Sequence, residues 1–190
     1  MGAGNHSVTE NTPKNVLFGA GTYHRGMSFD KTSGQLTIGE TLGATKGGGG
    51  LEIKGDIVPL ELDGALVAFE GQDIMCGGVG IIEATFAEVT PENVAMGMIG
   101  KVETGEGYSI VTPKATIEKG DYVPGFGFVG FTADKSRRVA VIMESALCTS
   151  GFKVEPKGKE QATLKLTMEA RAKIEGDLDT IPVTVIFLDK

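Results

Sequence analysis

Hydrophobic and polar residues alternate with a period of two along much of the chain. The clearest example is 160–172, which as a strand would point Ala162, Leu164, Leu166, Met168 and Ala170 to one side and Lys165, Thr167, Glu169 and Arg171 to the other. Successive side chains of a β-strand point to opposite faces of a sheet, so this pattern predicts a strand with one buried face.

A second alternating segment begins at Leu51. Its two predicted faces are Leu51, Ile53 and Ile57 on one side and Glu52, Lys54 and Asp56 on the other. The phase changes at Val58-Pro59, beyond which Leu60 and Leu62 form the apolar face and Glu61 the polar one. Pro59 indicates a bulge or a sheet edge because proline cannot donate a ladder hydrogen bond. Asp63-Gly64 is a hairpin signal, and we expect 65–75 to pair back.

Further strands are predicted from shorter apolar runs between glycines and turns. They are 16–21, two short segments in 28–40 around Thr32-Ser33-Gly34, 79–89, 108–113, 121–131, 137–148 and 181–189. In the last of these, Ile186 and Leu188 make the second face apolar as well. The segment 181–189 is therefore predicted to be a strand buried on both sides.

One short helix is predicted over 90–100. Thr90 is an N-cap candidate, Pro91 suits the first helical position, and Gly100 ends the pattern. Its apolar stripe would consist of Val94, Met98 and Ile99. A helix of barely three turns is marginal alone, so we expect it to pack on the sheet.

Eight to ten strands and one short helix predict a mainly β fold, an antiparallel β-sandwich or barrel with a short flanking α-helix. The first fourteen residues are polar and aperiodic and are predicted to form a flexible N-terminal arm. Residues 15–190 are then a single β-sandwich domain, with a mobile glycine-rich loop at about 40–50. The total of 29 glycines agrees with many short strands separated by turns.

Composition argues against nucleic-acid binding and membrane association and predicts the state of the two cysteines. The formal net charge is −7, so the chain lacks the surplus of Lys and Arg with which proteins bind nucleic acid. No apolar run approaches the roughly 20 residues of a membrane-spanning helix, so no membrane association is expected. Cys76 and Cys148 lie among apolar residues and are expected to be reduced thiols in the core.

The glycine-rich stretch GATKGGGG does not fit a phosphate-binding loop. A P-loop ends in Gly-Lys-Ser/Thr and opens a helix, whereas Lys46 precedes the glycines and a strand follows. The segment GAGTYH (19–24) begins like a dinucleotide fingerprint but has His24 in place of the third glycine. Neither nucleotide binding nor any other cofactor is predicted.

No catalytic or metal-binding arrangement emerges from the sequence. The two histidines, His6 and His24, have no close cysteine pair, and no Gly-x-Ser-x-Gly motif is present. Asp177 and Asp179 could serve hydrolysis or calcium, but an ordinary solvated turn is the favoured interpretation. We therefore do not expect an enzyme.

Three segments together resemble the major tail tube protein of long-tailed (siphovirus-type) bacteriophages. They are NVLFGAGTYHRG (15–26), LGATKGGGGLEIKGDIVPLELDGA (42–65) and ATLKLTMEAR…LDTIPVTVIFLD (162–189). The short helix TPENVAMGMIG (90–100) lies where such proteins carry their helix. The resemblance covers nearly the whole chain, but this chain ends at Lys190, without the immunoglobulin-like domain that some relatives add.

The resemblance implies a virion structural protein that self-assembles into stacked hexameric rings. The rings would form the tail tube, through which DNA passes during ejection without specific binding. Implied partners are the tape-measure, tail-terminator and tail-tip proteins, and the implied location is the virion tail, with the host cytoplasm during assembly. The family's inter-subunit loop would correspond to Gly43, Ala44, Thr45, Lys46, Gly47, Gly48, Gly49 and Gly50.

The lumen of such a tube should repel phosphate weakly, which an acidic subunit allows. The candidate lumen-facing residues are Glu52, Lys54, Asp56 and Glu61. An alternative is that they are ordinary outward-facing residues. The alternative function is a monomeric β-sandwich binding module for carbohydrate or surface adhesion, although the chain has no Trp and only three Tyr to build an aromatic platform.

Overall fold

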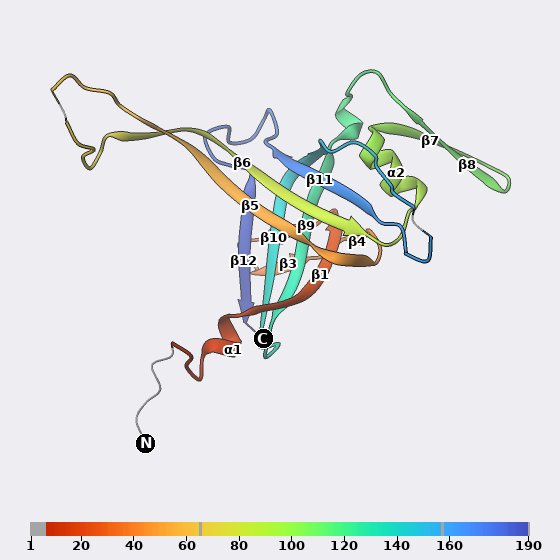
Figure 1. The fold of residues 1–190 in the computed structure, drawn as a ribbon, viewed down its shortest axis with the longest axis horizontal. Helices are drawn as coiled ribbons and strands as arrows, with labels where there is room; N and C mark the ends of the chain where they lie inside the picture. Colours follow the sequence, from red (N-terminus) through yellow and green to blue (C-terminus); the bar gives the residue numbers. More distant parts are fainter. Residues whose placement is uncertain (1–6, 65, 157, 190) are drawn as a thin grey trace.

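The computed structural model describes residues 7–64, 66–156 and 158–189 of the 190-residue chain. It is mainly β, with 53% strand and 8% helix, and contains one large antiparallel sheet and a short packed helix (Figure 1). The predicted fold class is therefore confirmed. Within the described residues, no helix is long and apolar enough to cross a membrane.

The strands and α-helices follow one another along the chain, with one 3-10 helix at Lys119–Asp121. In order they are α1 (Thr12–Asn15), β1 (Leu17–Arg25), β2 (Ser28–Asp30), β3 (Gln35–Thr37), β4 (Glu40–Thr41), β5 (Thr45–Pro59), β6 (Asp73–Phe86), α2 (Pro91–Met98), β7 (Gly100–Gly105), β8 (Tyr108–Pro113), β9 (Val123–Thr132), β10 (Arg137–Cys148), β11 (Leu164–Arg171) and β12 (Val183–Asp189).

The main sheet has the order β4-β1-β9-β10-β11-β6-β5, and β12 also pairs with β10. The first half of β10 pairs with β12, ending at Met143↔Val183. The second half pairs with β11, beginning at Ser145↔Arg171. The sheet therefore divides at Glu144, and β11, β6 and β5 run across β12, β10 and β9 as a second layer (Figure 1).

The main core lies between these two layers. Tyr23 of β1 packs against Phe128 of β9, with ring centroids 5.4 Å apart, and against Phe86 of β6 at 6.0 Å. The predicted inward positions Leu164, Leu166 and Met168 are fully buried in this core. The alternation in 160–172 thus identified a core strand correctly.

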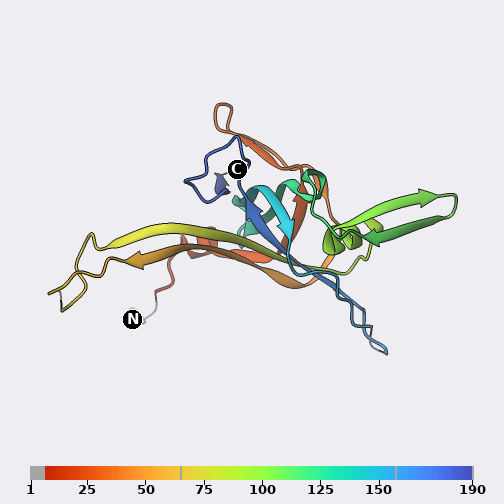
Figure 2. The same cartoon turned by 90° about the horizontal axis from the view of Figure 1, so that it is seen from above.

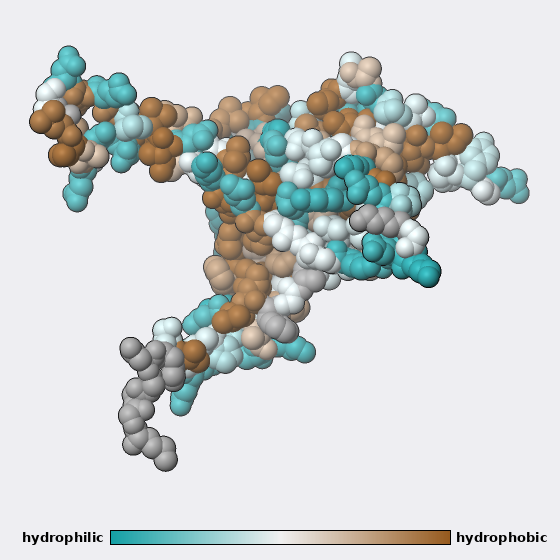
Figure 3. Space-filling view, in the orientation of Figure 1, coloured by the Kyte–Doolittle hydropathy of each residue, from teal (hydrophilic) through white to brown (hydrophobic). Residues whose placement is uncertain are grey.

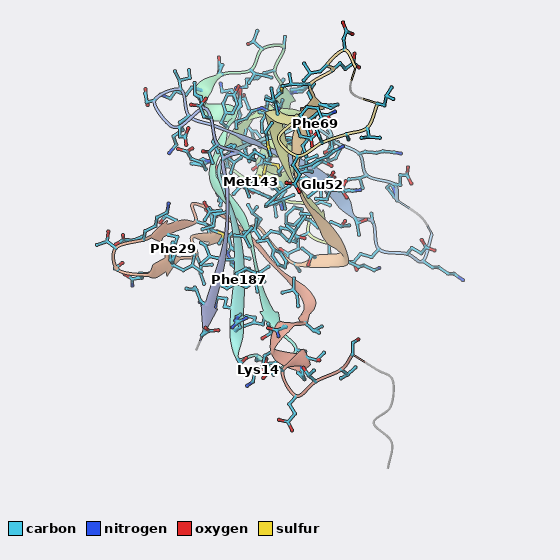
Figure 4. All side chains as sticks on the ribbon, turned by 90° about the vertical axis from the view of Figure 1, so that its left-hand side faces the viewer. Lys14, Phe29, Glu52, Phe69, Met143 and Phe187 are labelled. Carbon is cyan, nitrogen blue, oxygen red and sulfur yellow. The ribbon has the colours of Figure 1, made fainter. Side chains whose placement is uncertain are left out.

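A second cluster covers the opposite face of β9, β10 and β12. Met27, Val129, Ala140, Ile142 and Ile186 are buried there beneath the β2–β3 hairpin. Phe29, which extends from β2, packs against this cluster (Figure 4). The turn of the hairpin is the predicted Thr32-Ser33-Gly34, where Asp30 accepts hydrogen bonds from Thr32 and Ser33.

Helix α2 has the predicted cap but a different buried face. The Thr90 hydroxyl accepts a hydrogen bond from the backbone NH of Asn93 at 3.2 Å. Asn93 and Gly97, rather than Val94 and Met98, are the buried positions. A side chain at Gly97 would press on Leu166, so the missing side chain lets the helix approach the sheet closely.

Two hairpins project from the body (Figure 2). One is β7–β8, which contacts α2. The other is a long arm formed by the outer parts of β5 and β6, which pair from Leu51↔Ile82 to Pro59↔Asp73. At the root of the arm, the side chains of Ile181 and Val183 lie against Gly78 and Gly80. We call the described residues 51–64 and 66–80 the arm, and residues 60–64 and 66–72 its tip.

Three expectations from the sequence are corrected by this arrangement. The segment expected to pair back at 65–75 forms a strand only from Asp73. A local turn precedes it, in which the backbone NH of Phe69 donates to the Gln72 side chain and the NH of Gln72 donates to the Phe69 carbonyl oxygen. In the expected N-terminal arm, of which residues 1–6 lie outside the described range, residues 12–15 form α1. The chain then joins the sheet through a hydrogen bond from Ala133 to Val16.

The third correction concerns the glycine-rich segment expected as a loop at 40–50. Glu40–Thr41 is β4, and residues from Thr45 onward belong to β5. Between Thr45↔Phe86 and Gly49↔Ala84 the strand β5 carries two extra residues, which form a bulge. Gly47 and Gly48 have φ of +86° and +79°, a conformation that glycine adopts without steric cost.

Candidate assembly surfaces

One face of the arm is apolar and lies outside the core. Leu51, Ile53, Ile57 and Met75 share this face through the β5–β6 register, and all four side chains are exposed. Ile57 is 62% exposed and Met75 is 63% exposed. The alternation in 51–58 was predicted correctly. The face reaches the core only at Ile82, the partner of Leu51, and these four side chains stay exposed. Apolar residues gather along the arm in Figure 3.

The other face of the arm carries the charged residues. Glu52, Lys54 and Asp56 of the candidate lumen-facing set alternate along β5 and are exposed. Glu52 is labelled on the strand in Figure 4. Glu61 does not belong to this face, because β5 ends at Pro59 and Glu61 lies in the tip. Exposed Val58, Ile74 and Val79 also make this face less polar than β5 alone predicts.

The predicted inter-subunit segment, Gly43–Gly50, holds the root of the arm. The backbone NH of Ala44 donates to Glu88 at 3.0 Å, and its carbonyl oxygen accepts from the NH of Ala87 at 2.8 Å. Gly49 lies directly beneath the Tyr23 hydroxyl. The segment is thus hydrogen-bonded within its own chain, and Lys46, Gly47 and Gly48 form the bulge described above.

Strand β12 has a second exposed apolar surface. Ile186 is only 7% exposed because its face is covered by the β2–β3 hairpin, whereas Phe187 on the opposite face is 63% exposed and Val185 is also exposed (Figure 4). The prediction that 181–189 is buried on both sides is therefore wrong for the isolated chain. The sequence does show apolar residues on both faces of 181–189. Such a pattern does not distinguish a face buried in the core from an exposed apolar face.

Besides the two-residue strand β4 at one end of the main sheet, the longer strands β5 and β12 each have a hydrogen-bonding edge without a partner strand in the described structure. β5 pairs only with β6, and β12 pairs only with β10. An open edge presents a row of NH and carbonyl groups to which another strand can be added. Both open edges adjoin exposed apolar side chains, so backbone pairing and apolar burial could occur together.

Two polar side chains, Tyr23 and His24, are buried in the body of the protein. Burial, with a contribution from the negative charge of Glu83, raises the pKa of the Tyr23 hydroxyl above its ordinary value of 10. His24 is buried between β4 and β9, where its ring nitrogens contact the hydroxyls of Thr22 at 2.8 Å and Thr41 at 3.3 Å. Burial lowers the pKa of His24, which keeps the ring neutral near pH 7.

The residues considered for catalysis or metal binding do not converge. Cys148 is buried and Cys76 is exposed, so the expectation of a core position is wrong for Cys76, which lies on the arm. Neither forms a disulfide. The carboxylate of Asp177 accepts hydrogen bonds from the Thr180 hydroxyl and the Asp179 NH, which makes the segment an ordinary turn. Over the described part of the chain, no group of three or more His, Cys, Asp or Glu side chains could hold a metal ion.

Comparison with known proteins adds no family assignment. No protein-family model matches this sequence, and no curated protein matches it.

Proposed function

We propose that this protein is a structural subunit that assembles with copies of itself into a tube. The proposed tube has stacked hexameric rings, like that of the major tail tube proteins that the sequence resembles, and would serve as the conduit for DNA ejection. The observation that carries the proposal is the apolar face of the arm, which the described chain leaves in contact with solvent.

An exposed arm of this kind is costly for a protein that works alone. A two-stranded hairpin is at best marginally stable in water, and further strands or packing are needed to support it. Removing apolar surface from water is favourable by roughly 25 cal/mol per Å². Ile57 and Met75 would be buried if a neighbouring copy covered the arm, so self-assembly accounts for their exposure.

The open edges of β5 and β12 support the same proposal. A free edge beside exposed apolar residues is an aggregation risk that monomeric proteins usually remove with short edge strands, prolines or inward charges. β5 is 15 residues long. Pairing between edges of neighbouring copies would satisfy the backbone groups and extend the sheet around a ring.

The charges of the arm suit passage of DNA rather than its retention. Glu52 and Asp56 outnumber Lys54 on the charged face, and the whole chain carries a net charge of −7. If this face lines the tube, the wall repels phosphate weakly and DNA slides past without specific contacts. The proposal assigns no catalytic step to the protein.

The test is self-assembly of the purified full chain, by sedimentation velocity and negative-stain electron microscopy over a range of concentrations. We expect hollow tubes or rings that become more abundant as concentration rises. The double variant I57S/M75S should remain folded and assemble poorly, since both side chains are exposed in the single chain. The control I110S/I174S changes two exposed apolar residues away from the arm and should assemble normally.

A chain that stays at monomer mass at every concentration would contradict the proposal. Binding of that monomer to a carbohydrate array would then favour the alternative, a β-sandwich binding module. Assembly that is unaffected by I57S/M75S would remove the arm face from the interface.

A further inference from the structure

We propose that the acidic tip of the arm of one copy docks on the basic end of a second copy. This inference rests on the proposed self-assembly and names the contact that joins the copies. The two surfaces lie at different places on the chain and match in both charge and apolarity.

The tip combines negative charge with exposed apolar side chains. Glu61, Asp63 and Glu70 lie in it, and the sequence contains no Lys or Arg between Gly55 and Gly100. Its exposed apolar side chains are Leu60, Leu62, Leu66, Val67 and Phe69. Leu66 is 97% exposed, so the core of its own chain contributes nothing to its burial. Phe69 marks the tip in Figure 4.

The basic end consists of Lys14, Lys135, Arg137 and Arg138. Backbone hydrogen bonds from Ala133 to Val16 and from Asp134 to Pro13 hold α1 beside the β9–β10 turn, which brings Lys14 to the same end as Lys135 and Arg137. Arg138 follows on the opposite face of β10, over the ring of Phe131. Arg137 also donates to Asn15 at 3.4 Å. Lys14 and Lys135 are exposed.

The two acids nearest the β9–β10 turn already have partners, whereas Glu10, ahead of α1, is exposed. Asp189 pairs with Arg137 at 2.6 Å, and Asp134 accepts hydrogen bonds from the side chains of Thr132 and Ser136. Among the described residues, no ion pair involves Lys14 or Lys135. These two lysines are therefore available for the carboxylates of another chain.

Apolar side chains complete the basic end. Val16, Leu17 and Phe187 are exposed there, next to the cations, because α1 leads into β1 and Arg137 pairs with Asp189 at the end of β12. A tip that placed Leu66 or Phe69 on this surface would bury apolar area while its carboxylates met the lysines. Such a contact has an apolar centre and a charged rim, as in stable protein interfaces.

The tip cannot meet the basic end of its own chain in this conformation. Figure 1 shows the arm projecting from one side of the body, whereas α1 and the β9–β10 turn lie at the bottom, far from the tip. The occupant must therefore be a second copy. Because tip and basic end are different surfaces, the contact is heterologous and leaves both surfaces open for further copies, which yields a ring or a filament.

Charge reversal tests the contact. We would prepare the tip variant D63K/E70K and the basic-end variant K14E/K135E in the full chain. Each alone should raise the concentration needed for half-maximal assembly by about fivefold or more, since reversing two charges replaces attraction across the contact by repulsion. A 1:1 mixture of the two variants should recover assembly, because every tip then finds a basic end of opposite charge in the other variant.

The control E106K/E175K changes the net charge by the same amount as the tip variant, at two exposed glutamates outside both surfaces. It should assemble like the wild type. If the wild type assembles and both charge-reversal variants assemble as well as it does, the docking contact is overturned and the proposed self-assembly stays intact. The same holds if the variants assemble poorly and mixing them does not restore assembly. A wild-type chain that never assembles would overturn both.

Discussion

The hydroxyl of Tyr23 on β1 lies directly against the backbone of Gly49 on β5, although the two strands are not paired. A side chain at residue 49 would overlap both this hydroxyl and the carbonyl oxygen of Glu83. The two layers of the sandwich therefore meet at a position where only glycine fits. The contact connects the core to the root of the arm, so it also sets where the arm leaves the body.

Replacing Gly49 by alanine should destabilise the protein. The Cβ atom would force β1 and β5 apart, and overpacking of this kind costs about 1–3 kcal/mol. The measurement is the free energy of unfolding from urea denaturation. Gly50→Ala is the matched control, because a Cβ atom there would meet its nearest neighbour at 3.4 Å, an ordinary contact. Equal free energies of unfolding for the two variants would show that the close contact between Tyr23 and Gly49 does not restrict the residue at position 49.

Asn93 should stabilise the packing of α2 on the sheet. Its side-chain NH2 donates a buried hydrogen bond of 2.8 Å to the carbonyl oxygen of Leu42. Asn93→Ala leaves this buried carbonyl without that donor, at an expected cost of about 1–3 kcal/mol in thermal or urea unfolding. Glu92→Ala, at an exposed position of the same helix, should cost much less. A similar loss in both variants would point to helix propensity instead.

His24 should make stability depend on pH between 7 and 5. Its pKa is lowered by burial in the folded chain, so below its ordinary value of 6.5 the unfolded chain binds a proton that the folded chain does not. The free energy of unfolding must then fall as pH decreases through 6.5, and level off below the folded pKa.

This pH dependence can be isolated because the sequence has only two histidines. Urea denaturation at pH 7 and pH 5 should show a smaller stability loss in His24→Gln than in the wild type. His6→Gln is the control and should retain the wild-type loss. An unchanged pH dependence in His24→Gln would mean that other groups cause it.

Adjacent residues of β12 should separate folding from assembly. Ile186→Ala should reduce the stability of the monomer by about 2–4 kcal/mol, because Ile186 is buried beneath the β2–β3 hairpin. Phe187→Ala should change monomer stability by less than about 1 kcal/mol, since the ring is largely in solvent. Sedimentation velocity should nevertheless show weaker assembly for Phe187→Ala. Normal assembly of that variant would exclude this face of β12 from the interface.

Reversing the charged face of the arm should change how assembled particles interact with DNA. Particles of E52K/D56K should retain double-stranded DNA in a filter-binding assay at low salt, whereas wild-type particles should not, because Lys and Arg contacts to phosphate create affinity. A variant with the same charge change on the β7–β8 hairpin, E103K/E106K, controls for net charge. If both variants retain DNA equally, the charged face of the arm does not line the passage.

The sequence by itself determined the local structure. Alternation located β11 and most of β5, because successive side chains of a strand point to opposite faces, and an apolar run located β10. Thr90 and Pro91 located the start of α2, because a helix cap is made by residues next to it. The apolar residues of the arm and of 181–189 were also visible, and the resemblance to a tail tube protein followed from the same segments.

Only the tertiary structure decided which faces are covered. Ile186 and Phe187 are equally apolar neighbours, yet one is buried by a hairpin more than 140 positions earlier in the chain and the other is exposed. Asn93 and Gly97, not the expected apolar stripe, form the buried face of α2. Asn93 donates a hydrogen bond to the carbonyl oxygen of Leu42, and Gly97 leaves room for the side chain of Leu166. A local pattern states which side chains point together, whereas the segment that covers them comes from elsewhere in the chain or, as we propose for the arm, from another copy.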